Sequence, residues 1–266
     1  MIGADYFERQ AFAGAPLTDA VVIDAHGHIG DNQAFAFVDT SMEALVATMD
    51  RLGVDVACVS SIPAIYGQSA RGNDELLAAI AEYPDRLFGY VVVDIGYPER
   101  IPAELDRCLA GGVRGVKIHS SSGLPYAHPN YEPVYNFAAA HGLPLLAHTW
   151  SDQELDDLEP QFARCPNVNF LLGHAGAVAR EHYVRLAHQY PNVYLELCFS
   201  VCPRGLVEYF VGEGLAAKML WGSDCIFMSM EQQIGRVIFA KISEADKRLI
   251  LGETAARVLL GKGPGR

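Results

Sequence analysis

Short runs of apolar, often β-branched residues alternate with stretches of helical periodicity along nearly the whole chain. Some runs are continuously apolar, as at residues 90–93 and 170–172, which is typical of parallel strands covered on the outside by helices. The runs expected to form strands are 21–29, 54–62, 87–95, 113–120, 144–150, 168–173, 193–199 and 218–224.

The stretches between these runs carry the signals of helices and of their ends. Ser41 is the expected N-cap of the first helix, Gly53 follows that helix as a C′ glycine, and Asn73 is the expected cap of the second. Residues 243–246 resemble a capping box that opens an extra C-terminal helix. The helices are expected around 41–53, 73–83, 103–110, 131–140, 155–163, 178–189, 206–211 and 231–240.

Eight strand–helix units in 266 residues predict an α/β fold, a (β/α)8 TIM barrel with additional C-terminal helices packed outside it. An open doubly wound sheet is the alternative, but eight units and the lack of a Gly-rich dinucleotide loop disfavour it. No shift in composition and no Pro/Gly/Ser-rich linker divides the chain, so we expect a single domain over residues 1–266.

Composition excludes some functions. A formal net charge of −12 disfavours a protein that binds nucleic acid or an anionic membrane surface. The six cysteines form no Cys-x-x-Cys pair, and the first ten residues lack the basic and apolar regions of a signal peptide, so we expect a reducing, cytoplasmic setting. The expected partner is a small-molecule substrate, and a homo-oligomer remains open.

Candidate chemistry gathers at the ends of the predicted strands. His26 and His28 are one residue apart on the first strand, so they share a face, and Lys117 and His119 repeat this spacing on the fourth. Since barrel enzymes keep their chemistry at the carboxyl ends of the strands, the side chains there are expected to converge. The other residues at these ends are His148, His174 and Asp224, on the fifth, sixth and eighth strands.

This constellation resembles the amidohydrolase superfamily, in particular its amidohydrolase 2 branch, which contains aminocarboxymuconate-semialdehyde decarboxylases, resorcylate-type decarboxylases and lactone hydrolases. The resemblance covers nearly the whole chain. It departs from the family at Thr254, where the closing motif commonly has Asn, and we expect this to affect helix packing rather than chemistry. The segments that carry it are 23–28, 115–119, 173–176, 222–224 and 250–257.

The resemblance implies a metal site and two catalytic residues. His26, His28, His148 and Asp224 would hold one divalent ion, expected to be zinc, with manganese or another ion as the alternative. Such an ion acidifies a bound water molecule, from which Asp224 can take a proton, while His174 serves acid–base chemistry. A second ion bridged by a carboxylated Lys117 is the less favoured arrangement.

Further residues are candidates for binding substrate, because they lie on loops that cover the carboxyl end of a barrel or close to the metal ligands. Aromatic side chains there could hold a flat substrate, and Arg71 or Arg204 could bind a carboxylate. The competing interpretation for each is ordinary loop packing. The predicted substrate-binding residues are His119, Lys117, Arg71, Trp150 and Tyr66.

Three functions fit these residues. The favoured one is a metal-dependent hydrolase that cleaves a C–O or C–N bond of a small cyclic or aromatic, carboxylated compound with metal-activated water. The alternative is a metal-dependent decarboxylase on the same site, and the least favoured is a non-catalytic barrel. Resorcylate-type decarboxylases usually carry Glu at the position of His26, which counts against that subgroup and leaves the aminocarboxymuconate type open.

Overall fold

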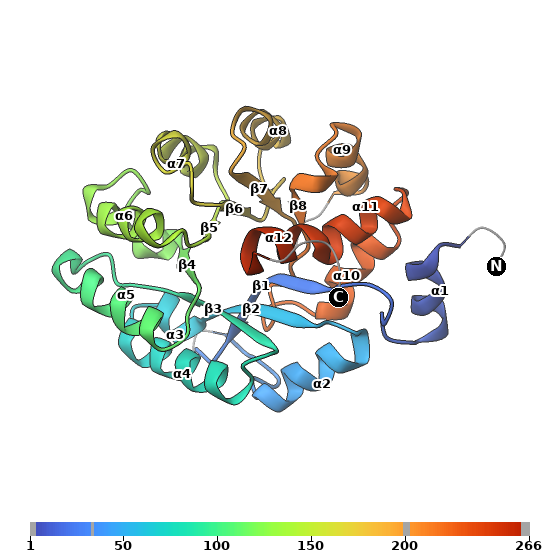
Figure 1. Ribbon diagram of the computed structural model, residues 1–266, viewed down its shortest axis with the longest axis horizontal. Helices are drawn as coiled ribbons and strands as arrows, with labels where there is room; N and C mark the ends of the chain where they lie inside the picture. Colours follow the sequence, from blue (N-terminus) through green and yellow to red (C-terminus); the bar gives the residue numbers. More distant parts are fainter. Residues whose placement is uncertain (1–3, 33–34, 199–202, 262–266) are drawn as a thin grey trace.

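The computed structural model describes residues 4–32, 35–198 and 203–261, and eight parallel strands follow one another around its centre (Figure 1). The backbone amide of Ala25 donates to the carbonyl of Trp221 at 3.0 Å, and Gly27 bridges to Cys225, which brings the last strand back to the first. The predicted (β/α)8 barrel is therefore confirmed. The strands are β1 (Ile23–Ile29), β2 (Val56–Ser61), β3 (Leu87–Val91), β4 (Gly115–Ile118), β5 (Leu145–His148), β6 (Phe170–Gly173), β7 (Val193–Glu196) and β8 (Met219–Leu220).

Helices surround this barrel in chain order, as Figure 1 shows. The α-helices are α1 (Tyr6–Ala13), α2 (Met42–Leu52), α3 (Ile62–Ile65), α4 (Ser69–Glu82), α5 (Ile101–Ala110), α6 (Glu132–His141), α7 (Asp152–Arg164), α8 (Arg180–Gln189), α9 (Leu206–Gly212), α10 (Met230–Ile238), α11 (Glu244–Arg248) and α12 (Thr254–Leu260). The 3₁₀ turns are η1 (Pro98–Arg100), η2 (Ser120–Ser122), η3 (Pro129–Tyr131) and η4 (Ala216–Lys218), and η5 (Leu249–Glu253) is a π-helical turn.

Two of the predicted helix caps are confirmed and one is wrong. Ser41 caps α2 by accepting a hydrogen bond from the amide of Ala44, and Gly53 ends that helix with φ 79°. Helix α4 begins at Ser69, ahead of the predicted cap Asn73. Asn73 is fully buried and donates to the carbonyl of Val92 at 2.9 Å, so its amide joins the helix to the strand region instead of capping.

The closing helix corrects the expectation that the C-terminal helices pack outside the barrel. Figure 1 shows α12 lying across one end of the barrel instead. Ala255, Ala256, Val258 and Leu259 of this helix pack in one apolar cluster with residues of the barrel interior. The interior residues of that cluster are Ile23, Ala25, Cys58, Phe88, Tyr90, Leu146, Leu171 and Leu220. The amino-terminal end of the barrel is thereby covered, and the carboxyl end is left for the site.

The last strand is shorter than the sequence predicts, because residues 221–224 leave the ladder with β7 and bond to β1. The amides of Ser223 and Asp224 both reach the carbonyl of His26, at 3.2 and 2.7 Å. This pairing turns Asp224 toward the histidines of β1. The predicted seventh strand ended at Phe199, which lies outside the described residues.

The turn before α12 contains a glycine that no other residue can replace without a shift. A Cβ on Gly252 would collide with the backbone of Val21, including a 2.5 Å approach to its carbonyl carbon. We expect Gly252→Ala to lower the free energy of unfolding by about 1–3 kcal/mol, the usual cost of overpacking, in denaturant titrations. Gly235→Ala in α10 is the matched control: nothing lies within 4 Å of its Cβ, so we expect a gain of roughly 0.5–1 kcal/mol. Equal effects of both substitutions would contradict the argument.

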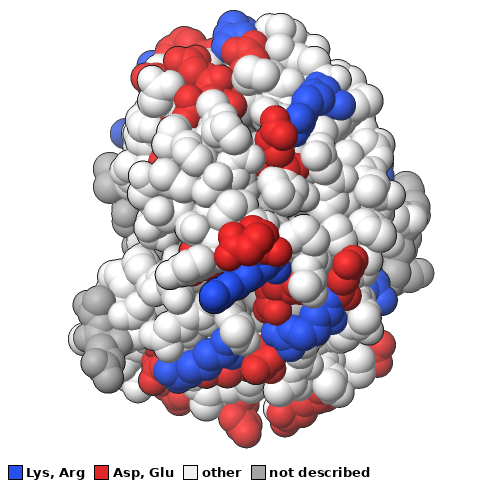
Figure 2. Space-filling model, turned by 90° about the vertical axis from the view of Figure 1, so that its left-hand side faces the viewer, with Lys and Arg blue, Asp and Glu red and all other residues white. Residues whose placement is uncertain are grey.

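Charges on the face shown in Figure 2 are mixed: basic side chains lie among acidic ones rather than forming a stripe. Among the ion pairs of the described residues, Arg107 of α5 pairs with Asp74 of α4 at 2.6 Å and with Glu104 at 2.8 Å. Within the described ranges, no helix combines the length and the apolar character needed to cross a membrane.

Candidate active site

A small pocket of about 200 Å³ lies at the carboxyl end of the barrel. Side chains from the ends of β1, β5, β6 and β8 reach it, and aromatic rings of the covering loops complete its wall. The structure therefore brings most of the predicted site residues together. The pocket is lined by His26, His28, Phe35, Ile65, Tyr66, His119, His148, Trp150, His174, Asp224 and Phe227.

Three of the predicted metal ligands form a tight donor cluster. Oδ1 of Asp224 lies 3.0 Å from Nε2 of His28 and 4.0 Å from Nε2 of His26, and the three ligand atoms all lie within 4.8 Å of one another. Atoms that share one ion at 2.0–2.2 Å lie about 3–4 Å apart, so the spacing fits a divalent cation. Burial raises the pKa of Asp224, but the hydrogen bond with His28 contributes to lowering it overall, which keeps the carboxylate ionised.

His148 lies in the same pocket, outside that three-residue cluster. Its ring centroid is 4.7 Å from that of His174. Its Nδ1 is 3.1 Å from Oγ of Ser120, so Nε2 is the ring nitrogen that could bind a metal ion. Burial lowers the pKa values of His26, His28 and His148 alike. These rings are therefore neutral, the form in which imidazole binds metal ions.

Residues behind the cluster hold the two histidines of β1. Nδ1 of His28 lies 3.0 Å from Oγ of Ser60, and Nδ1 of His26 lies 2.6 Å from Oε2 of Glu196. In both rings Nε2 therefore faces Asp224. Sequence reasoning did not identify Glu196; its only signal was an acidic residue inside the apolar run 193–197.

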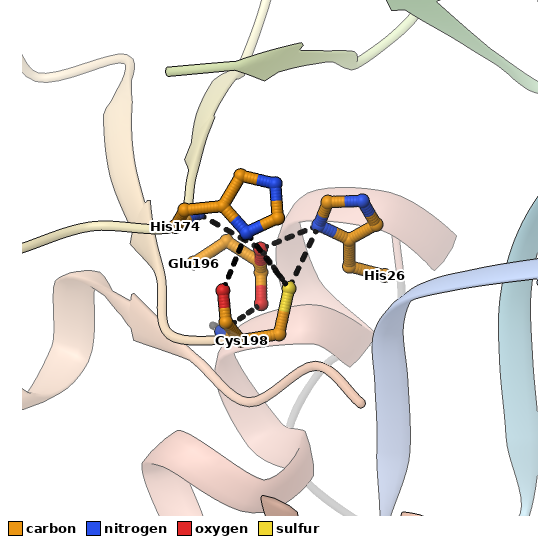
Figure 3. Close-up of side chains that lie close together, drawn as sticks. All are labelled: His26, His174, Glu196 and Cys198. Carbon is orange, nitrogen blue, oxygen red and sulfur yellow. Dashed lines mark hydrogen bonds and ion pairs between the residues drawn. The ribbon is translucent and has the colours of Figure 1, made fainter. Parts of the chain in front are cut away.

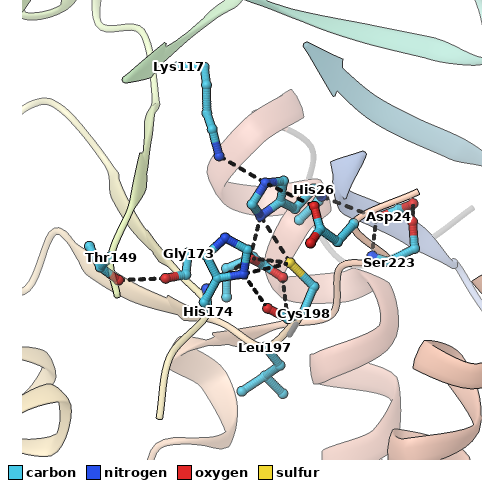
Figure 4. Close-up of polar contacts among 12 residues, drawn as sticks. Asp24, His26, Lys117, Thr149, Gly173, His174, Leu197, Cys198 and Ser223 are labelled. Carbon is cyan, nitrogen blue, oxygen red and sulfur yellow. Dashed lines mark hydrogen bonds and ion pairs between the residues drawn. The ribbon is translucent and has the colours of Figure 1, made fainter. Parts of the chain in front are cut away.

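Asp24 is a second buried carboxylate that sequence reasoning assigned no role. Its Oδ1 accepts hydrogen bonds from the amides of Ser223 at 2.8 Å and of His26 at 3.1 Å (Figure 4). It thus fixes the segment that carries Asp224 against β1. Burial raises the pKa of Asp24 to about 7, despite hydrogen bonds from Ser223 that lower it.

His174 and Asp224 share an unusual backbone conformation. With φ 62° and φ 55°, they are the non-glycine residues with positive φ in the part of the chain that the structure describes. This left-handed conformation costs on the order of 1–3 kcal/mol for a non-glycine residue, and such residues cluster at functional sites. In this backbone conformation, both side chains line the pocket.

The protonation of His174 follows from one contact. Its Nδ1 lies 2.6 Å from the backbone carbonyl oxygen of Cys198, which is only an acceptor, so Nδ1 carries the hydrogen. Burial lowers the pKa of His174 to about 4, although Asp224 raises it. At neutral pH the ring is therefore uncharged, and its Nε2 is an unprotonated acceptor.

Lys117 is a buried ammonium beside the donor cluster. Its Nζ lies 2.8 Å from Nε2 of His26, and Figure 4 shows it reaching that ring from β4. Burial lowers the pKa of Lys117 to about 8, so the group remains mostly charged at pH 7. Lys117 lines an adjoining pocket of about 250 Å³, which shares Tyr66 and His119 with the first.

The remaining predicted substrate-binding residues divide into two groups. His119 lies deep in the pocket, 4.2 Å between ring centroids from His148, whereas Trp150 and Tyr66 are each 40% exposed and border its mouth. Arg71 does not line the pocket: its side chain is 59% exposed, and its guanidinium pairs with Glu75 at 2.9 Å. The sequence predicted a loop at Arg71, but this residue lies in the first turn of α4, which begins earlier than expected.

Comparison with known proteins bears on the reaction. The chain is 23% identical over 296 residues to 2-amino-3-carboxymuconate-6-semialdehyde decarboxylase of Dictyostelium discoideum, covering 89% of this chain and 82% of the relative. The fold of this chain is similar to that of 2,6-dihydroxybenzoate decarboxylase from Rhizobium, with a TM-score of 0.73 at 18% identity. The match covers 91% of this chain and 98% of the other. The fold is also similar to that of dihydroxybenzoic acid decarboxylase from Polaromonas sp. JS666, whose structure contains bound manganese. The TM-score is 0.72 at 19% identity, and the match covers 91% of this chain and 97% of the other.

These findings make the sequence-based preference for a hydrolase wrong and point to the decarboxylase alternative. The sequence relative and both structural neighbours are named as decarboxylases. The physical reason for the error is that the same histidine and carboxylate ligands can hold a divalent cation for either reaction, so the ligand residues do not distinguish a hydrolase from a decarboxylase. The argument from His26 excluded only one decarboxylase subgroup.

The family of the chain rests on a match of its own. A family model described as amidohydrolase matches residues 23–260. That range begins at the first strand, contains the pocket and ends in the helix that covers the other end of the barrel. Each of the five segments on which the sequence resemblance rests lies within it. The chain belongs to the amidohydrolase family.

Proposed function

We propose that this protein is a metal-dependent decarboxylase that releases carbon dioxide from a small cyclic or aromatic carboxylic acid. The observation that carries the proposal is the position of Nζ of Lys117, which is buried 2.8 Å from a nitrogen of the donor cluster. A buried ammonium is costly unless an anion or a polar group pairs with it. A substrate carboxylate would supply that anion next to the metal site.

The residues that would hold the cation are His26, His28, His148 and Asp224. When bound, a divalent ion there supplies positive charge that binds a carboxylate and stabilises negative charge as the C–C bond breaks. Three imidazoles and one carboxylate suit zinc, and manganese is the metal bound by one structural neighbour, so both belong in the test. Lys117 acts as an ammonium in this proposal rather than as a carboxylated bridge.

Decarboxylation leaves the electron pair of the broken bond on carbon, so the product needs a proton there: R–COO⁻ and H⁺ give R–H and CO₂. His174 is the residue we assign to this transfer. Its unprotonated Nε2 can accept a proton from the substrate or solvent and return it to carbon, while the Cys198 carbonyl keeps Nδ1 protonated throughout.

The walls of the pocket indicate the shape of the substrate. Phe35, Tyr66, Trp150 and Phe227 present ring faces and edges around a volume of about 200 Å³. Small-molecule pockets usually measure about 300–1,000 Å³, so this one suits a compact, flat acid. His119 would contact the substrate from the side of Lys117.

The proposal is tested by following carbon dioxide release. Metal-free protein is loaded with manganese or zinc and given 2,6-dihydroxybenzoate, related carboxylated phenols and 2-amino-3-carboxymuconate-6-semialdehyde, beside a matched set of lactones, esters and amides. We expect carbon dioxide from at least one acid, loss of this activity with a chelator and its return with the metal. Acid release from the esters or lactones without any carbon dioxide would overturn the proposal.

A further inference from the structure

Glu196 is a fully buried acidic residue at the carboxyl end of β7, and its contacts extend beyond the ring of His26. Figure 3 shows three residues turned toward it. Its Oε2 lies 2.6 Å from Nδ1 of His26 and accepts from Sγ of Cys198 at 3.0 Å, while its Oε1 accepts from the amide of Cys198 at 2.6 Å. The amide of His174 approaches Oε2 at 3.4 Å.

These contacts are hydrogen bonds rather than a second metal site. His26, His174, Glu196 and Cys198 offer ligand atoms within 4.8 Å of one another, which by itself would fit an ion. However, two atoms bound to one ion at 2.0–2.2 Å are separated by about 3 Å or more. The separation of 2.6 Å between His26 and Glu196 is shorter than that and is the length of a charge-assisted hydrogen bond.

We propose that Glu196 is a positioning residue for two histidines. It determines that Nε2, the metal-binding nitrogen of His26 and the proton-transfer nitrogen of His174, is the unprotonated nitrogen in both rings. The inference rests on the proposed function for the role of His174, but its part concerning His26 depends only on the donor cluster. One carboxylate thereby couples metal affinity to proton transfer.

The His26 branch fixes a tautomer. The ammonium of Lys117 has only hydrogens to offer, so Nε2 of His26 is the acceptor in that contact and the hydrogen of the ring is on Nδ1. Oε2 of Glu196 is then the acceptor on the other side of the ring, which holds this tautomer. Burial raises the pKa of Glu196 to about 8, although hydrogen bonds from Cys198 and the charge of Lys117 lower it. Nε2 is also the nitrogen that faces Asp224. Glu196 thus presents the correct nitrogen of His26 to a cation.

The His174 branch runs through the backbone. Glu196 holds the amide of Cys198, and the carbonyl of the same residue accepts from Nδ1 of His174. By fixing Cys198, the carboxylate fixes the acceptor that keeps Nδ1 of His174 protonated and Nε2 bare. The two histidines, on different strands, therefore depend on a single side chain.

The surrounding backbone leaves room for Glu196. A Cβ on Gly222 would collide with Oε1 of Glu196 and approach Cβ of His26 to 2.8 Å, so only a glycine fits there. Gly173, at the end of β6, likewise lies beside the His26 ring, where a Cβ would come within 3.4 Å of Cε1. The contact between Glu196 and His26 thus depends on the ends of β6 and β7 and on the residues just after β8, where Gly173, Glu196 and Gly222 lie.

The test uses Glu196→Gln and Glu196→Ala in the full-length protein, with Glu104→Gln as the matched control. Glutamine keeps the shape of the side chain but replaces one of the two acceptor oxygens by an NH₂ donor. It therefore cannot accept hydrogen bonds both from His26 and from the amide and thiol of Cys198. Glu104 is a partly buried carboxylate on α5 that bonds to Asn73 and Arg107, away from the pocket. We expect manganese and zinc affinity to fall about 10–100-fold in both Glu196 variants and to stay unchanged in the control.

A second readout needs neither metal nor substrate. Nitrogen-15 NMR of the metal-free protein reports which ring nitrogen of each histidine is protonated. We expect His26 to be Nδ1-protonated in the wild type and to shift toward the Nε2-protonated form in Glu196→Gln, with thermal unfolding showing that the variant is folded. An unchanged tautomer with metal affinity within threefold of wild type would overturn the inference. Failure of the carbon dioxide assay would instead overturn the proposed function and leave this result standing.

Discussion

Replacing Asp224 with asparagine is expected to cost the protein its divalent cation. The carboxylate is the negatively charged member of the donor cluster, 3.0 Å from Nε2 of His28, and the rings of His26 and His28 and of nearby His148 are neutral. Asparagine tolerates the left-handed conformation at φ 55°, so the backbone should hold. We expect metal affinity to fall by at least about 100-fold, since even outer-shell partners are worth 10–100-fold. Metal content after dialysis and competition titrations measure this directly.

Asp31→Asn is the control for that experiment. Asp31 is 71% exposed and lies 3.8 Å from Arg71, so removal of its charge leaves the donor cluster untouched. We expect its metal affinity and its carbon dioxide release to match those of the wild type. If Asp224→Asn kept its metal as tightly as Asp31→Asn does, the ion would have to be bound by other residues.

The positions of the candidate metal ligands could be predicted because strand geometry determines them. His26 and His28 must share a face when they are one residue apart, and parallel strands must end at one edge of the barrel. The same reasoning placed His148, His174 and Asp224 at that edge, where the pocket is found. None of this required knowledge of any side-chain rotamer.

The outer contacts could not be predicted in this way. Glu196 lies on β7, 170 positions along the chain from His26, and only the closure of the barrel through β8 makes them neighbours. The location of α12 was missed for a related reason: an apolar face predicts burial but does not say against which surface. Arg71 was misplaced because its helix begins earlier than expected, and it pairs there with Glu75.

The reaction class could not be predicted from the ligands either. A cation with an open position can activate water or bind a substrate carboxylate, and the imidazoles and carboxylate that hold it are the same in both cases. In the proposed function, the feature that separates the two is the buried Nζ of Lys117, whose burial only the folded barrel provides.

Replacing His174 with asparagine is expected to lower turnover by about 10²–10⁴-fold, the usual contribution of a general acid–base group, while metal content stays unchanged. Asparagine accepts the backbone conformation at φ 62° but cannot take up a proton at the position of Nε2. Steady-state kinetics of carbon dioxide release and metal analysis of the same samples measure both quantities. His182→Asn, at a histidine on α8 that pairs with Asp152, should leave both at wild-type values.

His174→Gly separates proton transfer from a purely structural role. Glycine adopts positive φ without strain, so this variant keeps the backbone and leaves a space the size of an imidazole ring. If His174 moves a proton, added imidazole should restore part of the turnover in His174→Gly and little in His174→Asn, where the amide fills part of the space. Restoration should rise with the concentration of neutral imidazole, because the ring that it replaces is uncharged at neutral pH, its pKa being lowered by burial to about 4. Full activity in His174→Asn, or no effect of imidazole on a folded, metal-loaded His174→Gly, would remove His174 from the mechanism and leave the proton to the solvent.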